Sequence, residues 1–322
     1  MKLAKQLLPL LIAVVVLQLV FRFGLPFVWD GMPKFWDFDN QVDLAQQISV
    51  NAILAFGMTL TILIGGIDLS VGYVLTLAGT TTVYLLCLGE PESQSAVRLL
   101  VAMSAGLGVA ALFGALNGLF AAKTRMPPFI ITLATMLVAR GAALRFNEGR
   151  PMRILPHETA FLALGTDRVL DIPYPVIVMG VVFAAAAILL HRTRFGQHLY
   201  AIGGNREAAR YTGIPVARRE IAVYVICSLL AGIAAMIHTP QLYAARPDSG
   251  RGYELNAIAA AVVGGTSFSG GVGTMAGTLL GAIIIGIVNK GLNQAEVHHS
   301  WQDIIKGLVI LAAVYIDVRR RK

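Results

Sequence analysis

The segment GGIDLSVG, residues 65–72, places one carboxylate and one hydroxyl between two long apolar runs. A carboxylate in apolar surroundings can carry a proton or bind a cation, so Asp68 could supply the chemistry of an ion-coupled carrier. The residues also have a structural use, because Gly65 and Gly66 admit backbone angles that other residues avoid. Asp68 can accept hydrogen bonds from the N–H groups that open the next helix. We favour the structural role and keep ion coupling as the alternative.

A second stretch, GGTSFSGG at residues 264–271, echoes this pattern. Irregular backbone is tolerated inside a membrane only where protein or a water-filled cavity satisfies its polar groups. The functional interpretation, beside the structural one favoured above, is that both turns flank a translocation path. At a constant offset of 199 residues, Gly65, Gly66, Asp68 and Ser70 match Gly264, Gly265, Ser267 and Ser269.

Polar side chains in and near the apolar runs could offer hydrogen bonds to an uncharged polar substrate. Side chains of these types also fasten membrane helices to one another, which is their commoner use. The sequence leaves both roles open for each candidate. The candidates are Asn51, Asp68, Ser70, Asn117, Thr132, Asn256, Thr266 and Ser267.

Other kinds of chemistry find little support. Cys87 and Cys227 lie in separate apolar runs and lack the spacing of a zinc site. His298 and His299 show no nucleophile–base pairing, so a membrane enzyme is disfavoured. There is no G-x-x-x-x-G-K-[ST] phosphate loop, so any ATP must be bound by another chain. We expect no catalytic residue, no metal and no cofactor.

Composition sets the fold class. Of the 322 residues, 56% are hydrophobic and 14% are charged, whereas soluble domains carry about 25% charged residues. Ten apolar runs of a length that can cross a bilayer are centred near residues 13, 57, 80, 109, 136, 182, 229, 261, 281 and 311. The sequence predicts an all-α, polytopic helical membrane protein with a single domain over residues 1–322.

Two regions bear on the number of spans. The first run, residues 3–21, could be a signal peptide, but no small-x-small cleavage site follows, so we expect a retained span. Residues 253–291 are glycine-rich and could form two thin spans or a re-entrant hairpin. The expected count is ten spans, with eight as the fallback, and both counts leave the two termini on one side.

The net charge of +8 follows membrane topology. Loop 192–219 carries six arginines, which favours a cytoplasmic location by the positive-inside rule. Alternating spans then place both termini in the cytoplasm. The basic excess is thus an orientation signal within the lipid bilayer, and no nucleic-acid partner is expected.

Within this loop, residues 205–213 are typical of a short helix with both ends marked. Asn205 is a suitable N-cap, Gly213 can close the helix, and Pro215 prevents its continuation. The helix could orient the loop, anchor it to anionic lipid headgroups, or dock on a cytoplasmic partner. A partner would contact Asn205, Arg206, Glu207, Ala209, Arg210, Tyr211 and Gly213.

Four blocks stand in order along the chain: GGIDLSVG, NGLFAAKTRMPPFIITLATMLVARG (117–141), RTRFGQHLYAIGGNREAARYTGI (192–214) and GYELNAIAAAVVGGTSFSGG (252–271). From about residue 48 onward, the chain thereby resembles the permease subunits of bacterial ABC importers for simple sugars, the ribose-type family. The resemblance implies a permease dimer that opens alternately to each side of the inner membrane. It also implies a cytoplasmic ATPase that powers transport and an extracytoplasmic sugar-binding protein.

The resemblance makes residues 205–213 the coupling helix, seated in a groove of the ATPase. The expected function is the membrane-spanning permease subunit of an ATP-driven importer for a ribose-like pentose or related monosaccharide. The alternative is an ion-coupled secondary sugar transporter that uses Asp68. The sequence does not distinguish which sugar is carried, or a homodimer from a pair of related permeases.

Overall fold

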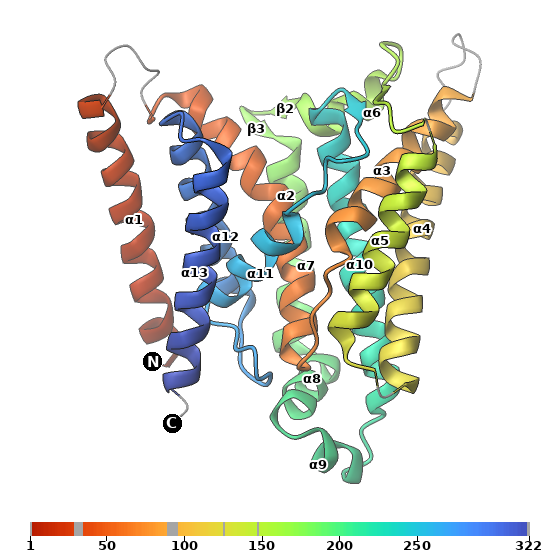
Figure 1. Cartoon of the computed structure of the whole chain (residues 1–322), viewed down its shortest axis with the longest axis vertical. Helices are drawn as coiled ribbons and strands as arrows, with labels where there is room; N and C mark the ends of the chain where they lie inside the picture. Colours follow the sequence, from red (N-terminus) through yellow and green to blue (C-terminus); the bar gives the residue numbers. More distant parts are fainter. Residues whose placement is uncertain (1, 29–34, 89–95, 125, 147, 321–322) are drawn as a thin grey trace.

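A computed structural model describes residues 2–28, 35–88, 96–124, 126–146 and 148–320. These residues form a helical bundle, which confirms the predicted polytopic helical membrane protein. α1 (Lys2–Val28) and α13 (His299–Arg320) lie at one edge of the bundle (Figure 1). Six of the described helices are long and apolar enough to cross a bilayer: α2 (Phe38–Leu63), α4 (Ala96–Lys123), α5 (Pro128–Arg145), α7 (Tyr174–Arg192), α10 (Val216–Gln241) and α12 (Met275–Gln294).

α2 forms the centre of the bundle. Of its most apolar window, 89% is buried, against 22% for α5 and for α7, which therefore present apolar side chains outward, as lipid contact requires. α10 packs on α2 and α4. Gly114 and Gly118 allow this close packing, because a methyl group on either would crowd the α10 backbone at Val225 or Ile221.

Two further segments interrupt the regular pattern. α3 (Val71–Cys87) has 17 residues and α11 (Tyr253–Val263) has 11. At about 1.5 Å per residue, neither helix reaches the roughly 30 Å of a bilayer core. In Figure 1 the chain runs from the end of α2 back into the bundle before α3 begins, and non-helical chain leads from α10 to α11. We call these two segments the broken crossings.

The region 253–291 contains one short and one full-length helix. α11 is short, whereas α12 has 20 residues and runs the height of the bundle (Figure 1). The loop between them reaches the end of α2, where the Gly271 N–H donates to the Leu63 carbonyl at 2.9 Å. The sequence left two thin spans or a re-entrant hairpin open for this region, and the structure forms one helix of 11 residues and one of 20 residues there.

Short elements close one end of the bundle. β1 (Met152–Arg153) pairs antiparallel with β4 (Ala244–Ala245), β2 (Arg168–Val169) pairs with β3 (Ile172–Pro173), and α6 (Thr159–Thr166) packs on α10. The opposite end carries α8 (Arg194–Gly204) and α9 (Arg206–Tyr211) (Figure 1). The beginning of α1 and the end of α13 also lie toward this second end.

Candidate functional site: platform and polar network

The sequence marks both ends of α9. Asn205 Oδ1 accepts a hydrogen bond from the Ala208 backbone N–H at 3.0 Å, which is an N-cap. Gly213 has φ of +83°, the left-handed conformation that ends many helices. The helical residues are Arg206–Tyr211, so the segment expected over 205–213 is a short helix together with its flanking caps.

The outward side of α9 is compact and polar. Tyr211 is 86% exposed, and Glu207 pairs with Arg210 at 3.8 Å, open to solvent. Ala209 points inward and is only 4% exposed. Its small side chain packs α9 against the rest of the protein, and contact of Ala209 with a partner stays a prediction.

A charged pair fastens α9 to the start of α10. Arg206 Nη1 donates to Glu220 Oε1 at 3.2 Å, and Arg206 Nη2 also contacts Glu220 Oε2. The Glu220 side chain is 4% exposed. A carboxylate this buried needs a cationic partner, so the pair fixes the orientation of α9 relative to α10.

Helix α8, which links α7 to α9, was not predicted from the sequence. Thr193 caps its start, because Thr193 Oγ1 accepts from the Gly196 N–H at 3.4 Å. Leu199 and Ile202 are buried, so one face of α8 packs on the bundle. Their three-residue spacing was the available sequence signal. We call α8 and α9 together the platform.

The end of α8 meets both glycine turns. A methyl group on Gly203 would overlap the Leu63 carbonyl and the Gly271 amide, so only glycine fits at this position. Leu63 ends α2 and Gly271 belongs to the loop after α11. We call Leu63, Gly203 and Gly271 the glycine junction, and it connects the platform to both broken crossings.

Two further hydrogen bonds hold the start of α12 to the platform and α7. Tyr200 Oη donates to the Gly273 carbonyl at 2.7 Å, and His191 Nε2 accepts from the Met275 N–H at 3.4 Å. Burial raises the pKa of Tyr200, so its hydroxyl stays protonated and able to donate near neutral pH.

The two glycine turns share one way of ending a helix. Gly65 and Gly265 have φ of +79° and +91°, and each is followed by the paired 5→2 and 6→1 bonds of a Schellman motif. After α2, the N–H groups of Gly65 and Gly66 donate to the carbonyls of Ile62 and Thr61, both at 2.9 Å. After α11, the N–H groups of Gly265 and Thr266 donate to the carbonyls of Val262 and Ala261, at 2.8 and 2.9 Å.

This motif corrects the alignment of the two turns. Gly65 corresponds to Gly265 rather than to Gly264, so the expected offset of 199 is wrong by one residue at the helix ends. The offset of 199 holds only beyond them, where the Ser70 N–H bonds to Asp68 and the Ser269 N–H bonds to Ser267.

Asp68 is fully buried, and it holds the start of α3. Its Oδ1 accepts from the Ser70 N–H at 2.9 Å and from Ser70 Oγ at 2.6 Å. The expectation that Asp68 accepts from N–H groups that open this helix holds for one of them, the N–H of the N-cap residue Ser70. Protein surrounds the Asp68 side chain.

Helices α4 and α5 extend this polar network. Asn117 Nδ2 donates to Ser70 Oγ at 2.9 Å, and Thr135 Oγ1 donates to Asn117 Oδ1 at 2.7 Å. Thr132 Oγ1 donates to the Ile67 carbonyl at 3.2 Å. The network therefore ties the first broken crossing to its neighbours, which is the interhelical use of such side chains.

Comparison with known proteins identifies the family. A family model described as "Branched-chain amino acid transport system / permease component" matches residues 40–314. The chain belongs to this permease family. The permease is similar to the ribose import permease protein RbsC of Escherichia coli strain K12, with 45% identity over 291 residues, 90% of this chain and 88% of the relative.

Two further relatives carry names from sugar transport. The permease is 43% identical to the ribose import permease protein RbsC of Bacillus subtilis strain 168 over 288 residues, 89% of this chain and 87% of the relative. It is 37% identical to the D-allose transport system permease protein AlsC of Escherichia coli strain K12 over 279 residues, 87% and 83% of the two chains. No solved structure matches the chain.

These relatives confirm the resemblance to permease subunits of bacterial ABC importers for simple sugars. The permease is therefore a transport component rather than an enzyme. Its membrane-crossing helices make it a multi-pass protein of the bacterial inner membrane.

The structure brings four of the expected path residues of the permease together and leaves four apart. Asp68, Ser70, Asn117 and Thr132 share the network described above. Elsewhere, Asn51 donates to the Gln47 carbonyl at 3.4 Å within α2, Asn256 lies in the first turn of α11, and Thr266 and Ser267 lie in the loop after α11. Contact of any of them with a substrate stays a prediction.

Two residues that make key contacts in this fold were not predicted as site residues from the sequence. Gly203 is the main one, and its signal was present: the doublet Gly203–Gly204 repeats the doublets at 65–66 and 264–265. Glu220 is the other, an acid directly after two arginines at the start of an apolar run. The chain has four glycine doublets, the fourth at 270–271. In this fold Gly203 packs on Gly271 of the fourth doublet and on Leu63, two residues before the first.

Proposed function

We propose that the chain is the membrane-spanning permease subunit of an ATP-driven ABC importer that carries a simple sugar, a ribose-like pentose or related monosaccharide. The observation that carries the proposal is the 45% identity to a ribose import permease over 90% of the chain. The family description alone names branched-chain amino acids, but the relatives at 35–45% identity are named for ribose, D-allose and L-arabinose.

The platform end would face the cytoplasm, with both termini beside it. The six arginines of loop 192–219 support this orientation. The helices alternate in direction through the bundle in Figure 1. Ten spans would follow if α1, α13 and the two broken crossings are counted with the six long apolar helices. Residues 1–322 would then form one transmembrane domain.

The coupling step would begin at α9. A cytoplasmic ATPase would contact the outward residues Glu207, Arg210 and Tyr211, while Asn205, Arg206 and Gly213 hold the helix in shape. Because α9 is bonded to α10 and α8 is packed on the glycine junction, a movement of the platform would shift both broken crossings. ATP would be bound by the partner alone.

Three further partners complete the importer. An extracytoplasmic sugar-binding protein would dock at the end that carries α6 and the β-strands. A second permease copy, identical or related, would enclose the path with this one. The lipid bilayer would cover the apolar faces of the outer helices.

A second candidate is an ion-coupled sugar transporter that uses Asp68. It is favoured by one feature: Asp68 Oδ2 is buried and has no hydrogen-bond partner among the described residues. An oxygen in this state could receive a proton or a cation during transport.

Uptake measurements separate the two candidates. The permease is reconstituted in proteoliposomes with its ATPase and binding protein, and uptake of labelled D-ribose, D-allose and L-arabinose is measured. Uptake that requires ATP and ignores a proton ionophore supports the importer. Uptake driven by an ion gradient without ATP would overturn it in favour of the second candidate.

A further inference from the structure

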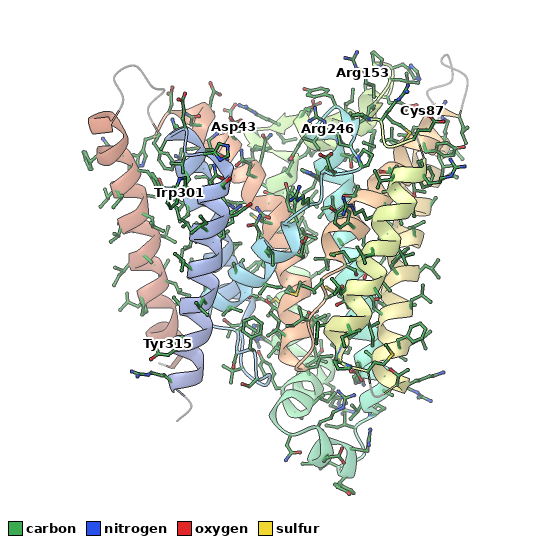
Figure 2. All side chains as sticks on the ribbon, in the orientation of Figure 1. Asp43, Cys87, Arg153, Arg246, Trp301 and Tyr315 are labelled. Atoms are coloured by element: carbon green, nitrogen blue, oxygen red, sulfur yellow. The ribbon has the colours of Figure 1, made fainter. Side chains whose placement is uncertain are left out.

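A cavity with several polar side chains in its wall lies at the end of the bundle opposite the platform. It has a volume of about 290 Å³ and lies between the first turns of α2, the end of α10 and the start of α11. Figure 2 shows Asp43, one of its lining residues, near the same end as Arg153 and Arg246. Its polar and aromatic lining residues are Asp43, Gln46, Gln47, His238, Gln241 and Tyr253.

The lining chemistry suits a neutral molecule with many hydroxyl groups. Each glutamine amide both donates and accepts hydrogen bonds, as a hydroxyl does. The one carboxylate, Asp43, lies 3.5 Å from Lys290, so its charge is compensated. A phosphate or an amino-acid zwitterion would need an uncompensated charge, which this set of residues does not provide.

Two buried polar atoms in the cavity wall lack partners, and they are complementary. His238 is 7% exposed. His238 Nε2 and Gln241 Nε2 are both buried, and each lacks a hydrogen-bond partner among the described residues. The amide nitrogen of Gln241 is a donor, and His238 Nε2 is an acceptor in the tautomer that carries its proton on Nδ1. Buried polar groups left unpaired are costly, and one ligand hydroxyl could accept from Gln241 and donate to His238.

Tyr253 adds an apolar surface to this polar set. Its ring packs edge-on against His238, with 5.1 Å between ring centroids and an interplanar angle of 61°. An aromatic ring offers an apolar face beside its polar hydroxyl, which matches a sugar ring with C–H groups on its faces and hydroxyls at its edge. At about 290 Å³, the cavity is near the lower limit, about 300 Å³, of small-molecule pockets.

We propose that this cavity is a low-affinity monosaccharide subsite of the permease itself, where a sugar released outside rests before it moves inward. Gln241 and His238 bind one hydroxyl, the α2 amides bind others, and Tyr253 contacts the ring. The site rests on the proposed function, because it assumes that the cargo is a simple sugar. A neighbouring cavity of about 260 Å³ shares Gln47 and adds further amide groups.

Binding of free sugars to the permease–ATPase complex in nanodiscs, without the binding protein, tests the proposal. Saturation-transfer NMR is recorded with D-ribose, D-allose, L-arabinose and, as the control ligand, L-leucine. The site predicts a signal for at least one sugar and none for leucine. Gln241→Leu should raise the Kd for that sugar by about tenfold or more, because it removes one well-placed hydrogen bond.

Matched variants make the result decisive. Gln197→Leu makes the same change on the exposed side of α8, at the other end of the bundle, and should leave sugar binding intact. His238→Phe keeps the ring and removes its acceptor, and Gln241→Leu stands alone if His238→Phe does not fold. The subsite is overturned if no sugar binds, if leucine binds equally, or if Gln241→Leu binds as the wild type does.

The uptake assay keeps this result separate from the proposed function. ATP-driven sugar uptake by a wild-type importer whose permease–ATPase complex binds no free sugar leaves the function intact and removes the subsite. Sugar binding that Gln241→Leu abolishes, in a protein without ATP-driven uptake, supports the subsite and removes the importer.

Discussion

The backbone of Gly271 is joined directly to Leu63, since the Gly271 amide donates to the Leu63 carbonyl at 2.9 Å. Leu63 ends α2, and Gly271 belongs to the loop between α11 and α12, so two distant parts of the chain share one hydrogen bond. Gly203 of the platform packs on both residues. A shift of α8 would therefore act on both broken crossings at once, as the coupling route proposed above requires.

Gly203→Ala should uncouple ATP hydrolysis from sugar uptake. The added methyl group overlaps backbone atoms that cannot rotate away, and overpacking of this kind costs about 1–3 kcal/mol. We expect uptake to fall by about tenfold or more, with hydrolysis retained, in proteoliposomes that contain the ATPase. The matched control is Gly204→Ala, since a methyl group there meets nothing within 4 Å. Equal uptake by both variants would remove the junction from the coupling route.

Arg206→Ala should destabilise the platform. The substitution leaves the Glu220 carboxylate buried without its cation, and we expect the free energy of unfolding to fall by about 2 kcal/mol. Breaking a fully buried pair costs roughly 3–5 kcal/mol. The expected loss is smaller here because the Arg206 side chain is 39% exposed. Thermal unfolding in detergent measures the change. Arg210→Ala breaks an exposed pair and should cost less than about 0.5 kcal/mol. Similar melting temperatures for the two variants would contradict the assigned difference.

Local signals of the sequence predicted α9 well. Asn205 and Gly213 act through bonds and angles within a few residues, so α9 could be located with its caps. The apolar runs likewise predicted the helices, because lipid demands about 20 apolar residues for each crossing. α8 was missed, since its buried Leu199 and Ile202 form too short a pattern to stand out beside longer runs.

Contacts between distant segments could not be predicted in the same way. Gly203 is a functional candidate only because Leu63 and Gly271 approach it, and no local pattern encodes that approach. Asp68 stands out in the sequence as a carboxylate between two apolar runs, but its enclosure beside Ser70 and Asn117 depends on contacts between separate helices. The offset of 199 failed at the helix ends because identical letters were aligned rather than positions with the same backbone angle.

Tyr211→Cys, labelled with a short reagent that joins a thiol to a lysine amine, should form a cross-link with the ATPase subunit. Tyr211 is 86% exposed on the outward side of α9, so a thiol there reaches a docked partner. Ala209→Cys is the control, because position 209 is buried and its thiol should stay unlinked under the same conditions. The measurement is a shifted band that contains both subunits. A band from position 209 alone would mean that α9 docks with its other side.

Asp68→Asn should leave ATP-driven uptake within about threefold of wild type. An asparagine keeps one side-chain carbonyl that can accept from Ser70, so the clasp at the start of α3 survives the loss of charge. Asp68→Ala removes both of these bonds, each worth about 0.5–1.5 kcal/mol, and should lower both thermal stability and uptake. Uptake is measured with ATP, with and without a proton ionophore. Ion coupling predicts the reverse order of importance, because the charge would matter more than the clasp, and Asp68→Asn would then abolish gradient-driven transport in a protein that remains fully folded.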